Sequence, residues 1–261
     1  MIYEKGSKLL TYLAIKYKGD WDLIYNALIA KEMYERSVID EEISKLKCKY
    51  ITALDNDYPR QLKNIYKAPF VLFYYGDISL AQNMNRCLAV VGSRNASDYG
   101  LKMTRKILEG LCPEKVIVSG MAVGIDAEAH RSAIRNFGKT IAVLGCGIDY
   151  CYPSENLDLY LELKENHLIL SEIPNKEFRP METFAFRNRI ITGLCKGVLV
   201  PEIHPKSGTN ISVNFALQQD REIMIVPYRA DENSESNRII KQGAYLVESA
   251  EDVVNVLDVF K

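Results

Sequence analysis

From Cys87 onward, short apolar runs alternate with longer amphipathic stretches. The runs are "CLAVVGS", "VIVSG", "TIAVLG", "LILSEI", "GVLVPEI", "IMIVP" and "AYLV". Because the core of each run is apolar throughout, with no alternation of polar residues, it is typical of a strand buried on both faces of a parallel sheet. The stretches between the runs are long enough for crossover helices. The pattern predicts an α/β fold with a doubly wound, Rossmann-like, mostly parallel sheet.

The first 50 residues follow a different period. Their apolar residues recur at spacings of three and four, which favours short helices separated at Gly19 and Asp20. Residues 51–84 contain two prolines and a Gly-Asp pair, which favours an extended segment. We therefore expect a small helical N-terminal module at 1–50, an extended lead-in at 51–84 and the Rossmann-like domain at 85–261.

Composition limits the classes of partner. The chain has 261 residues, and 33 Lys and Arg nearly balance 34 Asp and Glu, so any anion site must be local. No uninterrupted apolar run reaches roughly 18 residues, the length needed to cross a bilayer. We expect a soluble, cytoplasmic protein without a membrane partner.

Cysteine and histidine give no metal-binding pattern. The six cysteines form no C-x-x-C pair, and the chain has three histidines. Such spacing favours reduced, buried thiols over a tetrahedral metal site. We expect no metal and no cofactor.

Polar clusters follow five of the predicted strands. They are "GSRNAS", "SGMAVGID", "GCGIDYCYP", "SEIPNK" and "PEIHPKSGTN". In a doubly wound fold the carboxyl ends of the strands meet at one crevice, where ligands bind. The five loops therefore predict a binding site at that edge of the sheet.

The stretch "VSGMAVGIDAEAH" joins a strand to a helix through Gly120 and Gly124. A third glycine in register is missing, so the dinucleotide fingerprint G-x-G-x-x-G is not met. Two interpretations stay open. The turn amides and helix N-terminus hold an anion, or the glycines only permit a tight turn. Asp126 is expected to cap the helix and His130 to be packed.

The stretch "VVGSRNASDYG" has the same arrangement with an added cation. Gly92 and Ser93 allow close approach, and Arg94 supplies a forked donor that matches phosphate. Ser97 or Asp98 is expected to cap the following helix.

Two arginines stand close together in "FAFRNRIITGL". Arg187 and Arg189 lie two residues apart on a predicted helix, so they point in different directions. One is expected to face the crevice, and the other to pair with a carboxylate such as Glu172 or Glu202.

Two further basic positions differ in their surroundings. In "KSGTN", Lys206 and Ser207 precede a predicted helix and form an anion-friendly turn. Lys139 precedes the strand at Thr140 and therefore lies at the end of the strand that faces away from the crevice. From its position alone we expect only a solvated cation.

In this order, these motifs resemble the DNA processing protein A family, also called DprA or Smf. The similarity includes the lead-in "DNDYPRQLKNIYKAPFVLFYYGD" and the ending "NRIIKQGAYLVESAEDV", and covers roughly residues 50–255. It implies a single-stranded DNA-binding protein of natural transformation and recombination that is not an enzyme. Such proteins protect incoming DNA, load the RecA recombinase and form a homodimer through the Rossmann-like domain.

The resemblance also assigns site residues. It implies that Arg94 binds the strand and that Lys139 is the family's basic residue before the "TIAV" strand. Tyr150 or Tyr152 is a candidate to stack a base. The other DNA-binding candidates follow from motif and rim position and are Gly92, Ser93, Gly120, Gly124, Arg187, Arg189, Lys206 and Ser207.

The sequence departs from the family in three places, one of which is the "SGTNISV" turn, where the usual run of small residues is not kept. Tyr228 and Ser236 stand where many members have glycine, so the loop between them is expected to follow a different course. Because the sequence ends at Lys261, we expect no winged-helix-like C-terminal domain of the kind that many relatives have.

Two alternative functions are compatible with the sequence. Phosphoribohydrolases share the Rossmann-like fold, and Glu172 or Glu202 would then be the acid that acts on a glycosidic bond, although pairing with an arginine is favoured. The second alternative is a protein that chiefly docks on RecA.

Overall fold

The computed structural model describes residues 2–177, 181–205, 207–232 and 235–258; the side chains of 2–5 and 181–182 lie outside the description. Nine strands are formed, β1 (Lys49–Thr52), β2 (Val71–Gly76), β3 (Cys87–Val90), β4 (Val116–Ser119), β5 (Thr140–Val143), β6 (Leu168–Ser171), β7 (Gly197–Val200), β8 (Glu222–Ile225) and β9 (Tyr245–Leu246). The α-helices are α1 (Ile2–Lys16), α2 (Trp21–Ile29), α3 (Arg36–Ser44), α4 (Asp98–Glu109), α5 (Ile125–Arg135), α6 (Leu157–Asn166), α7 (Met181–Gly193), α8 (Thr209–Gln218), α9 (Ser236–Lys241) and α10 (Ala250–Asp258).

All nine strands belong to one sheet, in the order β1-β2-β6-β5-β4-β3-β7-β8-β9. The seven strands from β3 onward pair in parallel, and each coincides with one of the apolar runs. The predicted α/β class and mostly parallel sheet are confirmed. The chain builds outward from β3 to β6 and then returns to place β7 on the other side of β3. This reversal makes the space beyond β3 and β7 the topological switch point, where open α/β sheets bind ligands.

The segment before β3 forms paired strands, which its composition does not predict. β1 and β2 pair antiparallel with each other, and β2 pairs antiparallel with β6. The lead-in is therefore extended, as expected, and it also lengthens the sheet. The division of the chain at residues 50 and 84 stays a prediction. β1 spans the first of these positions, and the sheet runs across the second.

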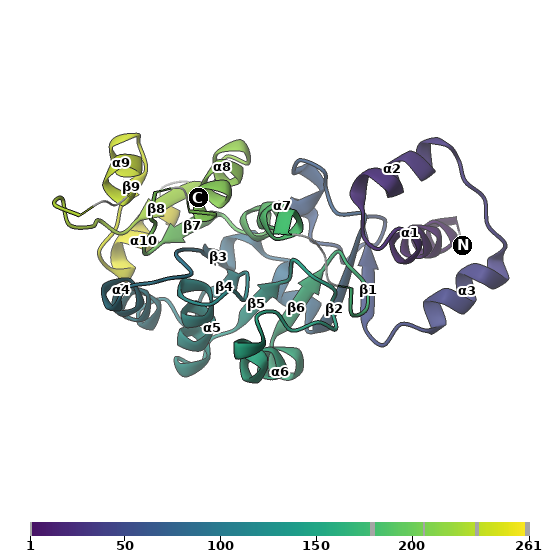
Figure 1. The fold of residues 1–261 in the computed structure, drawn as a ribbon, viewed down its shortest axis with the longest axis horizontal. Coiled ribbons are helices and arrows are strands. Elements are labelled where there is room, and N and C mark those ends of the chain that lie inside the picture. Colours follow the sequence, from purple (N-terminus) through teal and green to yellow (C-terminus); the bar gives the residue numbers. More distant parts are fainter. Residues whose placement is uncertain (1, 178–180, 206, 233–234, 259–261) are drawn as a thin grey trace.

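Alternate residues of the central strands enter different cores. In β3, Cys87 and Ala89 pack in a cluster with α7 and α8, whereas Leu88 and Val90 pack with α4 and α5. Figure 1 shows the corresponding layers, with α4, α5 and α6 on one face of the sheet and α7 and α8 on the other. Burial on both faces is the physical reason why these strands are apolar throughout.

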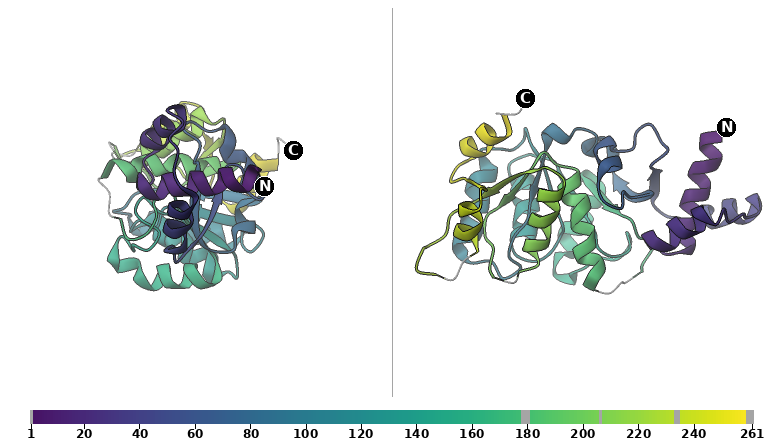
Figure 2. Two further views of the ribbon diagram at one scale, coloured as in Figure 1. Left: turned by 90° about the vertical axis from the view of Figure 1, so that its right-hand side faces the viewer. Right: turned by 90° about the horizontal axis from the view of Figure 1, so that it is seen from above.

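The N-terminal helices α1–α3 confirm the helical pattern of the first 50 residues. They lie at the β1 end of the long axis, opposite the C-terminal helices (Figure 2). Leu10, Leu13 and Ile24 are buried there in a core cluster that also contains residues of β2 and α6. None of the described helices has the length and apolar composition needed to span a bilayer.

Candidate functional site

A cleft of about 520 Å³ opens at the switch point beyond β3 and β7. Its walls come from the loop after β3 (91–95), the start of α5, the middle of α7 (184–188) and the segment from His204 to Ser212. A smaller hollow of about 70 Å³ adjoins it and also contains Arg94 and Arg187 in its lining. Of the five predicted loops, those after β3, β4, β5 and β7 thus contribute to the two spaces.

Arg94 is the exposed cation of the cleft. Its side chain lines both spaces, and it makes no hydrogen bond or ion pair with any residue that the structure describes. The helix that follows is capped by Ser97, whose side chain accepts from the Gly100 amide, as predicted. A guanidinium without a protein partner retains all its donors for an anion.

Gly92, Gly120 and Gly124 are packed against protein atoms. A Cβ at Gly92 would meet Ile125 Cγ1 at 2.6 Å, and one at Gly120 would meet Arg187 Nη2 at 2.5 Å. Gly124 has φ +81° and lies against the Arg94 carbonyl. The glycines therefore make room for neighbouring parts of the chain, and their place in the DNA site stays a prediction.

Asp126 does not cap α5, whose N-cap residue is Gly124. Its carboxylate lies in the first turn and accepts from the amides of Gly120 and Ala122 at 3.2 and 3.4 Å. Burial raises the pKa of the Asp126 carboxyl, although Arg187 and these amides oppose the shift. Two amides of this turn therefore bind an internal carboxyl group rather than an external anion.

Arg187 is buried beneath the cleft, with 6% of its surface exposed. Its Nη1 donates to the carbonyls of Gly120, at 3.0 Å, and Val143. Burial lowers the pKa of the guanidinium to about 10, while Asp126 opposes the shift. The group stays protonated at neutral pH and joins the ends of β4 and β5.

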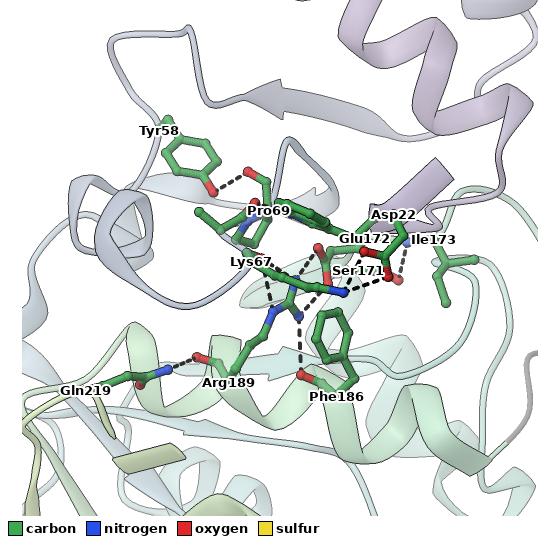
Figure 3. A network of polar contacts seen from close by, with 12 residues as sticks. Asp22, Tyr58, Lys67, Pro69, Ser171, Glu172, Ile173, Phe186, Arg189 and Gln219 are labelled. Carbon is green, nitrogen blue, oxygen red and sulfur yellow. Dashed lines mark hydrogen bonds and ion pairs between the residues drawn. The ribbon is translucent and has the colours of Figure 1, made fainter. Parts of the chain in front are cut away.

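Arg189 points away from the cleft, since residues two apart on a helix lie about 200° apart around its axis. It is fully buried and binds Glu172 through two hydrogen bonds of 2.6 and 2.7 Å. It also donates to the carbonyl of Lys67, as Figure 3 shows. The predicted split of the two arginines, one toward the crevice and one paired, corresponds to this arrangement, and Arg189 does not contribute to the cleft.

The two tyrosine candidates lie in different surroundings. Tyr152 lines the smaller hollow, has 36% of its surface exposed and lies with its ring centroid 5.1 Å from that of Phe184. Tyr150 is partly buried against the core cluster around α6. The structure therefore brings Tyr152, and not Tyr150, beside Arg94.

The remaining basic candidates are dispersed. Ser207 lines the cleft just before α8. At the neighbouring Gly208 the space is open, because an added Cβ would have no atom within 4 Å. Lys206 lies outside the described residues. Lys139 donates from Nζ to the Asn166 carbonyl at 3.0 Å, at the opposite strand end, and does not line the cleft.

Glu172 and Glu202, the carboxylates of the hydrolase alternative, are both engaged by protein groups. Glu172 binds Arg189, and Glu202 is fully buried and accepts from the Ser97 amide and hydroxyl. His204 Nε2 lies 2.8 Å from Glu202 Oε1. Neither glutamate lines the cleft, whereas His204 does.

Sequence reasoning missed His204 as a cleft residue. The signal was its place two residues after Glu202 in a loop that follows a strand at the switch point. Asn95 and Asn188 also line the cleft and were missed, because amides in loops are too common to mark a site. No group of three His, Cys, Asp or Glu residues within the described ranges is arranged to hold a metal.

Comparison with known proteins shows which family the chain resembles. A family model described as DNA recombination-mediator protein A matches residues 49–258. The chain belongs to this family. It is 41% identical to the DNA processing protein DprA of Streptococcus pneumoniae over 88% of this chain and 82% of that protein. The DprA of Bacillus subtilis is 40% identical over 77% of this chain and 68% of its own length. The chain spans 49% of the matched Smf protein of Synechocystis.

Two solved structures share the fold of this recombination-mediator family. The S. pneumoniae DprA structure superimposes with a TM-score of 0.80 and 36% identity, covering 97% of this chain and 96% of that one. The Helicobacter pylori DNA processing protein A structure, which describes a single-stranded DNA binding mode of that protein, has a TM-score of 0.73 and 28% identity. The superposition covers 81% of this chain and 96% of the H. pylori chain. The similarity to the family that the motifs indicated is confirmed.

Proposed function

We propose that the protein binds single-stranded DNA in the cleft at the switch point, protects the strand and loads RecA recombinase on it during natural transformation or recombination. The observation that carries the proposal is Arg94, an exposed guanidinium that has no partner among the described residues and lines both the cleft and the adjoining hollow. Membership of the recombination-mediator family supports the same role. So does the single-stranded DNA binding of the H. pylori relative.

The arrangement suits a flexible strand. A backbone phosphate at Arg94 would lie beside the start of α8, where the helix dipole favours an anion. The base of the same nucleotide would then reach the hollow where Tyr152 is exposed, and stacking of this kind contributes about 1 to 3 kcal/mol. Binding proceeds without breaking any bond, so the proposed function is not enzymatic.

The direct test is a titration of the protein into a labelled oligo-dT strand at low and moderate salt, with a duplex of equal length as competitor. We expect tight binding that weakens as salt rises, because phosphate contacts release counterions. The duplex should compete poorly. Absence of binding at low salt would overturn the proposal.

The variant that tests the cleft is Arg94→Ala. Loss of one charge-assisted phosphate contact should cost about 1.5 to 3 kcal/mol, or roughly ten- to a hundredfold in affinity. The slope of log K against log salt should become shallower by about 0.7. Arg60→Ala is the matched control, because Arg60 is exposed, has no described partner and lies outside the cleft. Equal losses in both variants would contradict the assignment.

Lys139 tests the part of the site that the resemblance alone implies. Because it lies at the opposite strand end, Lys139→Ala should change the affinity for a short strand less than Arg94→Ala does. An equal loss would place Lys139 on the DNA path. Loading of RecA is tested by RecA filament growth on oligo-dT strands with and without this protein, and the proposed homodimer by sedimentation. A homodimer would join two clefts on one strand.

The nucleotide-hydrolysing alternative predicts free base released from nucleoside monophosphates. We expect none, because Glu172 and Glu202 are both held by protein donors and neither lines the cleft. Release of base that is lost in Glu202→Gln would favour the enzyme.

A further inference from the structure

Asn188 lines the cleft from α7, and Arg187 holds its side-chain amide in one orientation. Arg187 Nε donates to the amide oxygen Oδ1 at 3.1 Å. A guanidinium carries only donors, so the amide atom that faces it must be the oxygen. Nη1 of the same guanidinium donates to the carbonyls of Gly120 and Val143, which fixes the guanidinium and, through it, the Asn188 amide.

The nitrogen of this amide is left for a ligand. Nδ2 carries two donors and makes no hydrogen bond with any residue in the described ranges. Because Oδ1 is already bonded to Arg187, Asn188 cannot offer the paired acceptor and donor that read the edge of an adenine. It offers donors alone, which suit an acceptor-only group such as a phosphate oxygen.

Two serines add hydroxyl groups to the same cleft. Ser93, 5% exposed, follows β3, and Ser212, 1% exposed, lies on α8. Neither hydroxyl makes a hydrogen bond with the part of the chain that the structure describes. A serine within a helix can bond the carbonyl four residues earlier, and Ser212 does not do so. Unsatisfied polar groups on buried residues are rare in native proteins, which indicates that a ligand or water bonds these hydroxyls.

We propose that Ser93, Asn188 and Ser212 are neutral donors that hold a phosphate of the strand beside Arg94. This inference rests on the proposed binding of single-stranded DNA and completes the set of groups at that site. The motif around Ser93 already predicts a contact there, whereas Asn188 and Ser212 are new to the site. Arg94 supplies the charge, and the neutral donors supply direction. Asp126 also lines the cleft, but its carboxylate accepts from two amides of the turn after β4.

The experiment compares the oligo-dT affinities of Asn188→Ala and Ser212→Ala with that of the unmodified protein over a range of salt concentrations. Each variant should bind about three- to tenfold more weakly, as expected for the loss of one hydrogen bond. The slope of log K against log salt should stay unchanged, because a neutral donor releases no counterion. The slope therefore distinguishes these variants from Arg94→Ala. Asn26→Ala is the matched control, since Asn26 is exposed on α2, outside the cleft, and should bind like the unmodified protein.

Asn188→Asp separates contact with the strand from support of Arg187. The carboxylate keeps an oxygen opposite Nε and adds a charge that pairs with the guanidinium, so the variant should unfold at no lower urea concentration than the unmodified protein. It also replaces the Nδ2 donors with an oxygen that repels phosphate, so it should bind more weakly than Asn188→Ala. Asn26→Asp adds the same charge outside the cleft and should leave the affinity unchanged. Full affinity in Asn188→Asp would mean that Asn188 only supports Arg187, and would overturn the proposal.

The amide of Asn188 also gives a direct signal in ¹⁵N–¹H spectra. Its side-chain resonances are those that are missing from the spectrum of Asn188→Asp, and they should shift when oligo-dT is added to the unmodified protein. An amide that does not shift overturns the contact. The loss of affinity in Asn188→Ala should be equal on oligo-dA and oligo-dT, and a loss confined to oligo-dT overturns the assignment to phosphate.

Failure of this inference can be distinguished from failure of the proposed function. If the unmodified protein binds oligo-dT and both alanine variants of the cleft bind equally well, the proposed function stands and the neutral donors are overturned. Unchanged affinity in one variant overturns the assignment of that residue. Absence of binding by the unmodified protein overturns the proposed function and this inference together.

Discussion

Replacement of Arg189 by methionine separates an arginine that maintains the fold from one that binds a ligand. The guanidinium is fully buried, binds both oxygens of Glu172 and donates to the Lys67 carbonyl (Figure 3). Its Cζ atom also lies 3.8 Å from the centre of the Phe186 ring. Methionine fills much of the space but leaves the carboxylate, which is 14% exposed, without a cation.

The magnitude follows from the burial of the remaining charge. Breaking a buried ion pair by removing one partner costs about 3 to 5 kcal/mol, because the other charge stays desolvated. For a chain of this size each kcal/mol shifts the melting temperature by about 2 to 4 °C, so Arg189→Met should lower it by roughly 6 to 20 °C. The combined replacement Arg189→Met with Glu172→Leu should recover at least half of the loss, since no unpaired charge is then buried.

Urea unfolding and oligo-dT titration together provide the assay. Arg229→Met is the matched control, because the Arg229–Asp231 pair is about 70% exposed on both sides and such pairs contribute about 0 to 1 kcal/mol. A loss below about 1 kcal/mol for Arg189→Met would refute the argument, since it would mean that water solvates Glu172 in the folded protein. Loss of DNA affinity in folded Arg189→Met would equally refute the view that this arginine is remote from the cleft.

Two further predictions concern the turn after β4 and the histidine behind it. Gly124→Ala should destabilise the fold by about 2 to 3 kcal/mol and lower oligo-dT affinity, because φ is +81° and the new Cβ would meet the Arg94 carbonyl carbon at 2.9 Å. Gly243→Ala, at φ +110° in open space, should cost less and leave binding intact; equal costs in urea unfolding would contradict the role of close packing. For His130, whose pKa falls to about 3 in the folded state, the unfolded chain binds the proton first as the pH drops below about 6.5. The free energy of unfolding should therefore fall by about 2 kcal/mol between pH 7 and pH 5, and a fall of the same size in His130→Asn would show that another group is responsible.

The local pattern of the chain predicted its architecture well, because burial on both faces leaves a direct trace in composition. Each run from "CLAVVGS" to "AYLV" became a parallel strand, and the spacing of three and four in the first 50 residues became helices. Ser97 was identifiable as a cap because its hydroxyl bonds an amide only three residues ahead. Such features depend on neighbours in sequence, so the sequence alone is sufficient to determine them.

The strands of the lead-in were harder to predict. β1 and β2 pair antiparallel, but β2 joins the sheet through β6, which lies almost 100 residues later. Their prolines and mixed polarity indicated an extended segment without showing its partner. Pairing over such a distance depends on which edge of the sheet the intervening chain leaves open.

By itself, then, the sequence determined the α/β class, the loops that gather at the carboxyl ends of the strands and the family to which the motifs belong. Only the tertiary structure decided which cation is available to a ligand. Arg94 has no partner within the described part of the chain, Arg187 is buried beneath the cleft, and Arg189 binds Glu172. The physical reason is that the role of a charged side chain is set by burial and by partners from distant segments, as with Glu202 and Ser97, which lie 105 residues apart. Hydrophobic periodicity reports that a position is buried, and carries no information about which distant group lies next to it.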